Sequence, residues 1–147
     1  MVKKLCFTFV ILLPMYSFAQ YFSNADSTEQ RIISEDCDDK IFNKVEILPS
    51  LKKGAKNFED TLSYYLKVCN AFKNDSRATF RFLVTTSSHI FDIKKEVGNF
   101  QNEALLKEIL ISHSSMWKTA VQNDRQVCAY ISLEIEISNE VLTIAVK

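Results

Sequence analysis

"SMWKTAVQNDRQVCAYISLEIEI", residues 115–137, contains the pattern that decides the fold. From Val127 to Ile137 every odd position is apolar, whereas most of the intervening even positions are polar. Alternation with a period of two is typical of a strand that buries one face, as in an antiparallel sheet covered by helices on one side only. We therefore predict a half-buried strand over 127–137, preceded by a turn of the chain.

Two segments before this strand show the three-to-four spacing of amphipathic helices. The first begins at a predicted N-cap, Asn57, and its apolar stripe consists of Phe58, Leu62, Tyr65, Leu66 and Cys69. The second spans 102–117, and its apolar face consists of Leu105, Leu106, Ile109, Leu110, His113 and Trp117. This spacing predicts that Cys69 is a small core residue rather than a nucleophile, and that Trp117 is a core residue rather than a platform for a ligand.

Three further segments are predicted as strands, namely 41–48 and the two arms of a hairpin, 77–86 and 91–97. The last segment, "VLTIAVK" (141–147), either extends the strand before it or pairs back on it. The resulting order is strand, helix, strand, strand, helix, strand. It predicts an α+β fold, a two-layer sandwich in which two helices pack on a three- or four-stranded antiparallel sheet.

The first nineteen residues have the features of a signal peptide. Lys3 and Lys4 precede an apolar stretch that is shorter than the roughly 20 residues a membrane-spanning helix needs. Ser17 and Ala19 then provide the small residues of a cleavage site. We expect a chain exported to the periplasm, with an uncleaved inner-membrane anchor as the alternative. Residues 20–40 are polar without a sustained period and are predicted to be a flexible leader to a domain over 41–147.

Composition excludes several classes of function. The 147 residues carry no formal net charge, so no basic surface indicates nucleic-acid binding. Only two glycines are present, which leaves no phosphate-binding loop, and no cysteine spacing indicates a zinc site. His89 and His113 are the only histidines, and an isolated histidine is usually structural or solvated. We expect no enzyme, no cofactor and no metal, and no small-molecule substrate is evident.

Three cysteines remain after the signal peptide: Cys37, Cys69 and Cys128. One disulfide and one free thiol are compatible with an exported protein, and the sequence leaves the pairing open. The predicted faces of Cys69 and Cys128 differ, which argues against a bridge between those two. A separate hypothesis is an enzyme that uses Cys37 or Cys128 as a thiol nucleophile.

Two longer stretches carry a resemblance to a known family. "DKIFNKVEILPSLKKGAKNFEDTLSYYLK" (39–67) and "NEALLKEILISHSSMWKTAVQNDRQVCAYISLEIEI" (102–137) resemble, in the same order, the opening and closing segments of Bacteroidetes-type TonB C-terminal domains. The chain departs from that pattern at Lys52, Lys53, Thr119 and Asp124, where the family usually has proline or glycine. It is therefore similar to a divergent, stand-alone member.

The resemblance implies a protein-binding module that engages a TonB-dependent outer-membrane transporter by edge-strand pairing, as part of energy-coupled transport. Unpaired backbone groups on such an edge bind an extended segment of the partner. The expected binding residues are Arg125, Val127, Cys128, Ala129, Tyr130 and Ile131. The alternatives are that 141–147 or a second subunit covers this edge. The alternative function is a structural or self-associating periplasmic protein that dimerises through its edge strand. A leader of about twenty residues is too short for energy transfer by this chain alone.

Overall fold

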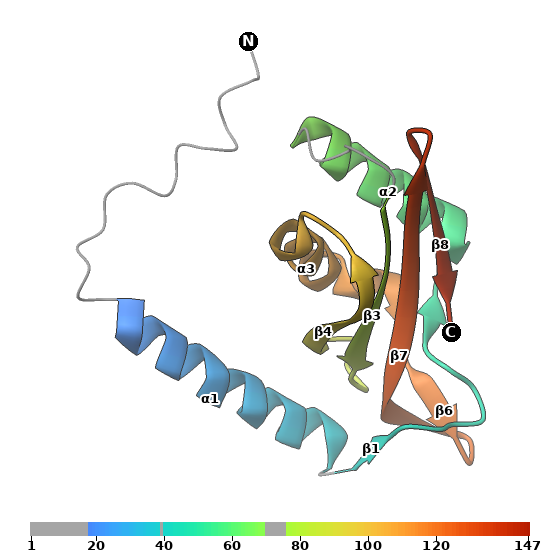
Figure 1. Ribbon diagram of the computed structural model, residues 1–147. Coiled ribbons are helices and arrows are strands. Elements are labelled where there is room, and N and C mark those ends of the chain that lie inside the picture. The colour runs from blue at the N-terminus through green and yellow to red at the C-terminus, as the bar shows by residue number, and fades with distance from the viewer. Residues whose placement is uncertain (1–17, 39, 70–75) are drawn as a thin grey trace. The chain divides into compact units, whose positions relative to one another are not determined.

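The computed structural model describes residues 18–38, 40–69 and 76–147, which form a mixed α+β structure (Figure 1). The described residues divide into two units, with the boundary between Ile32 and Ile33. The predicted signal peptide lies almost entirely outside the described residues. Within the described ranges, no helix combines the length and apolar character needed to cross a membrane.

Residues 20–40 were predicted to be a flexible leader. Most of this segment is instead helical, because α1 spans Phe18–Cys37. Alanine, glutamate, glutamine and arginine favour a helix even where no apolar stripe marks one. These residue types recur along the segment, at Ala25, Glu29, Gln30 and Arg31 among others. The absence of an apolar period was therefore a poor guide to the backbone conformation of this segment.

Strand β7 organises the sheet, and its residues bear out the predicted alternation. The odd positions from Ala129 to Ile137 are buried, and the even positions from Tyr130 onward are half-buried or exposed. β7 pairs with β3 along one side, and β3 pairs in turn with β4. Along its other side β7 pairs in succession with β6, β1 and β8. The strands are β1 (Ile41–Phe42), β3 (Ser76–Val84), β4 (Ile90–Asn99), β6 (Ala120–Gln122), β7 (Arg125–Ser138) and β8 (Val141–Val146).

The sheet therefore has six strands and is mixed, rather than three- or four-stranded and antiparallel. β1 runs parallel to β7, whereas the other pairs are antiparallel. The predicted hairpin is confirmed as β3 and β4, and the last segment pairs back on β7 as β8. The strands missed in the sequence have only two or three residues each, and a period of two cannot be recognised over so short a length.

The two predicted helices are present, with different ends. α2 spans Gly54–Val68, so Asn57 lies inside the helix and is not its N-cap. α3 spans Glu103–Ser112, and a 3-10 turn, η1 (Ser114–Met116), follows it. Trp117 then starts β5 (Trp117–Lys118), which pairs with β2 (Ser50–Leu51). The sequence thus placed Trp117 correctly in the core but wrongly in a helix.

Both helices contribute to one apolar core against the sheet. Trp117 is fully buried and packs edge-to-face on Phe58 of α2 and Phe82 of β3, with ring centroids 6.0 and 5.1 Å away. The same core contains Leu62 and Leu66 of α2, Leu106, Ile109 and Leu110 of α3, and Ile131, Leu133 and Ile135 of β7. The buried face of β7 is therefore the one that meets the helices, and its even positions lie on the opposite face.

Candidate functional site

Each residue predicted to bind a partner already pairs with at least one other strand of the sheet. On one side, Ala129, Tyr130 and Ile131 pair with Val84, Leu83 and Phe82 of β3. On the other side, β6 pairs with Arg125–Val127 and β1 pairs with Cys128 and Ala129. Both edges of β7 are therefore paired at Ala129, whereas each of the other predicted positions pairs with one neighbouring strand. Alternation reports which face of a strand is buried, and it contains no information on whether the strand's edges are paired.

Tyr130 is engaged within the protein. Its hydroxyl donates a hydrogen bond of 2.8 Å to Asp92 of β4, and the Arg81 guanidinium lies 3.9 Å from the centre of its ring. Burial and this hydrogen bond raise the pKa of Tyr130. Burial alone would raise the pKa of Asp92, but hydrogen bonds from Lys94 and Tyr130 outweigh it and lower that pKa. The network ties β7 to β4 across β3.

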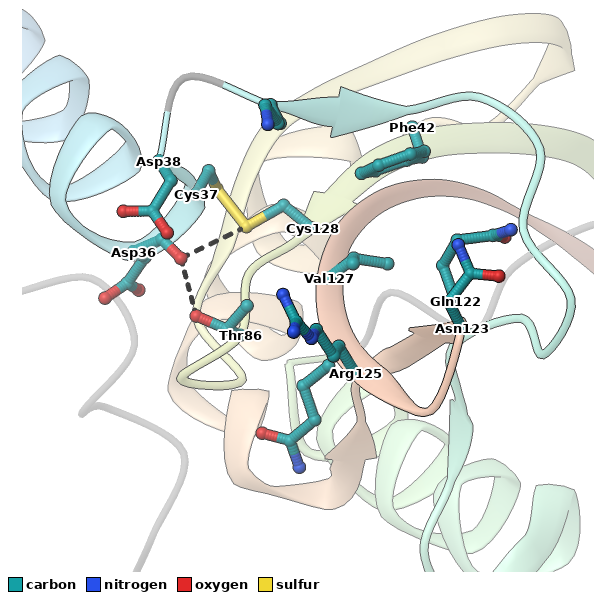
Figure 2. A pocket seen from close by; sticks show the side chains of 12 residues that line it. Asp36, Cys37, Asp38, Phe42, Thr86, Gln122, Asn123, Arg125, Val127 and Cys128 are labelled. Atoms are coloured by element: carbon teal, nitrogen blue, oxygen red, sulfur yellow. Dashed lines mark hydrogen bonds between the residues drawn. A yellow bond between two sulfur atoms is a disulfide. The ribbon is translucent and has the colours of Figure 1, made fainter.

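A disulfide between Cys37 and Cys128 links the end of α1 to β7 (Figure 2). Both cysteines are buried and pack with Leu83 in a small cluster on the face of the sheet away from α2 and α3. The pairing that the sequence left open is therefore assigned. With their sulfurs bonded to each other, neither cysteine provides the thiolate that a nucleophile requires. Cys69 is a half-buried residue at the C-cap of α2, which corrects its prediction as a core residue.

Asp36 provides a second link between the end of α1 and the rest of the protein, here to the loop between β3 and β4. Its carboxylate accepts hydrogen bonds from Thr85 (2.7 Å) and Ser87 (2.9 Å) and lies 3.1 Å from Nδ1 of His89. Burial alone would raise the pKa of Asp36, but these contacts outweigh it and lower the pKa. Ser87 and His89 both contact the carboxylate, whereas a catalytic triad needs the histidine between serine and acid. The cluster therefore holds the β3–β4 loop against residue 36.

A cavity of about 580 Å³ opens beside the disulfide, between residues 36–42 and the β6–β7 turn (Figure 2). Arg125, Val127 and Cys128 line it, so three of the predicted site residues meet there. Its charged lining residues are of both signs: Asp36, Asp38, Lys40 and Arg125. Among the described residues, no three His, Cys, Asp or Glu side chains gather closely enough to hold a metal ion. This lining favours no single class of ligand.

Two of the outer strands, β4 and β8, lie on opposite sides of the sheet (Figure 1) and differ strongly in charge and in register. β4 contains Asp92, Lys94, Lys95 and Glu96, and its register against β3 shifts twice. β8, "VLTIAV", contains no charged residue, and all six of its residues pair with β7 in one regular register. Charges and bulges block strand addition, whereas an uncharged, regular edge strand permits it.

The register of β8 against β7 determines which of its backbone N–H and C=O groups point away from the sheet. Ser132 and Lys147 exchange backbone hydrogen bonds, so the odd residues of β8 bond to β7 and Leu142, Ile144 and Val146 point outward. The amide of Ile144 donates a hydrogen bond of 3.1 Å to Glu59 of α2. Neither Leu142 nor Val146 has a partner for its outward groups among the described residues. This edge is not among the predicted binding residues, although the lack of charge in 141–146 was a signal for it.

Comparisons with protein-family models, with curated proteins and with solved structures found no match to this chain. The resemblance to TonB C-terminal domains therefore stays a prediction that rests on the two quoted stretches.

Proposed function

We propose that the chain is an exported protein-binding module that pairs an extended segment of a partner protein with the outer edge of β8. The observation that carries this proposal is the contrast between β8, which is uncharged and regular, and β4, which is charged and irregular. Backbone pairing supplies the affinity in this kind of recognition, and alternate side chains supply the specificity. The binding edge is one strand further out than the sequence analysis predicted.

The resemblance to TonB C-terminal domains supports the same mode of binding. A compact two-layer arrangement of α2 and α3 on one face of the sheet would hold β8 rigid and leave its edge accessible. The proposed partner is a segment of a TonB-dependent outer-membrane transporter, reached in the periplasm. No catalytic step is part of this function.

The same edge supports a second candidate, a homodimer. β8 has no charge to repel its own copy, so two β8 strands can pair antiparallel about a two-fold axis. The molar mass of the full chain in solution separates the two candidates. A dimer whose mass does not change on dilution favours self-association, and a monomer favours the binding module.

Photocrosslinking in cells tests the main proposal. A photoreactive residue replaces Ala145 on β8 in one variant and Val97 on β4 in a matched control, since both side chains are exposed. We expect an adduct with an outer-membrane protein at position 145 and none at 97, and a strand-forming peptide added in excess should suppress it. Equal yields at the two positions would contradict the proposal.

A further inference from the structure

Glu59 occupies the middle of the edge that a partner strand would use. It is the only side chain among the described residues that bonds an outward amide of β8, through the 3.1 Å hydrogen bond from Ile144. The Glu59 side chain is only 16% exposed, so it lies against β8 rather than in open solvent. An incoming strand must therefore displace a partly buried carboxylate from its hydrogen bond.

The geometry of antiparallel pairing decides what replaces this contact. Ile144 points its backbone outward, so the residue opposite it in a new strand would accept the Ile144 amide with its own carbonyl oxygen. In such a pair the two side chains lie on the same face of the sheet. The side chain of Ile144 faces α2, as the alternate burial of β8 indicates. The side chain opposite Ile144 would therefore lie beside Glu59.

If a partner strand displaced Glu59 from Ile144, the Glu59 carboxylate would lose its hydrogen-bond donor. The added strand would also cover the carboxylate further. A partly buried carboxylate without a donor is unfavourable. Lys56 lies 3.7 Å from Glu59, but it is 79% exposed and contacts Asp60 more closely, at 3.0 Å. An ion pair so exposed contributes little. Lys147 is paired with Glu134 on the other face. The part of the chain that the structure describes thus offers Glu59 no strong replacement.

We propose that β8 selects extended segments with a lysine or arginine opposite Ile144, and that Glu59 is the residue that determines this specificity. The inference rests on the proposed strand pairing at β8 and names the chemistry of the partner. A basic side chain at that position replaces the lost amide donor, and apolar residues two positions away on either side pack against α2. An acidic residue there would place two carboxylates side by side.

Peptides with one variable position test this specificity. The peptides are TVTKTVT, TVTATVT and TVTETVT, in which the two valines and the central residue lie on the same face of an extended strand. Binding is followed by NMR at the Ile144 amide of the isotopically labelled full chain. We expect the lysine peptide to bind about 3–10-fold more tightly than the alanine peptide, and the glutamate peptide to bind most weakly. Glu59→Gln should reduce the lysine-to-glutamate ratio to about twofold or less, and Glu59→Lys should reverse it.

Asp60→Asn is the matched control, because it makes the same change of charge one residue away and touches the same Lys56. It should leave the preference for lysine unchanged. Equal affinities of the unchanged chain for the three peptides would overturn the inference and leave strand pairing at β8 intact. No binding of any peptide to the unchanged chain or to Glu59→Gln would overturn the docking edge itself, and the inference with it.

Discussion

Two outer strands of one sheet, β4 and β8, are protected in different ways. β4 is protected by its own sequence, through four charged residues between positions 92 and 96 and two shifts of register against β3. β8 has no such features, and one side chain from α2, Glu59, occupies the middle of its edge. The first kind of protection is permanent, because it is built into the strand. The second can be displaced, so a sheet can close one edge and keep the other available.

Gly98→Ala should have the largest effect, because it disturbs the strand on the protected side. Gly98 has a φ of +90°, and an added Cβ would lie 2.0 Å from the carbonyl oxygen of Arg77 on β3. We expect a loss of about 4 kcal/mol in the free energy of unfolding, measured with urea. Gly54→Ala is the control, since Gly54 also has a positive φ but has open space around it, and about 1 kcal/mol should be lost there. Equal losses would contradict the account.

Truncation of one side chain on each outer strand sharpens the comparison of their packing. Leu142 of β8 is 5% exposed and lies in the core, whereas Val97 of β4 is 67% exposed. Leu142→Ala should lower the free energy of unfolding by about 3 kcal/mol, and Val97→Ala by no more than about 0.5 kcal/mol. Similar values from thermal or urea unfolding would mean that β8 is not packed as described.

Asp92→Asn tests the network that links β4 to Tyr130. The pKa of Asp92 is lowered in the fold, so its contribution to stability is present above the ordinary aspartate pKa and is lost as the pH falls through the folded value. We expect the variant to lose about 1 kcal/mol at neutral pH, and the difference should shrink below about pH 4. Asparagine tolerates the positive φ of 50° at this position, so backbone strain should not contribute. A difference that is constant with pH would exclude this explanation.

Val146→Pro separates binding from stability at the edge of β8. The amide of Val146 points outward, so proline removes a donor that only an added strand would use. Val146→Ala is the matched control for lost packing, and the stabilities of the two variants should agree within about 0.5 kcal/mol. We expect the proline variant alone to lose most of its affinity for TVTKTVT in the NMR titration. Equal affinities would show that the partner does not use this edge.

The sequence was informative where a pattern repeats over many residues. The alternation in β7 and β3 predicted their buried faces correctly, and so did Phe58, Leu62 and Leu66 in the stripe of α2. The hairpin of β3 and β4 was also predicted, although Val97 of β4 is exposed rather than buried. The pairing of β7 on both sides could not be read in this way, because β1 and β6 are too short to show a period. The bridge between Cys37 and Cys128 and the contact of Glu59 with Ile144 join residues 91 and 85 positions apart. Neither depends on a local pattern.

Amide hydrogen exchange in β8 tests the central claim most directly. The amides of Thr143 and Ala145 bond to β7, whereas that of Val146 points outward and that of Ile144 is held by Glu59. In the free chain we predict fast exchange at Val146, slower exchange at Ile144, and the slowest exchange at Thr143 and Ala145. Adding TVTKTVT should slow the two outward amides selectively. Outward amides that are already as slow as the inward ones, and that do not respond to the peptide, would contradict an open edge on β8.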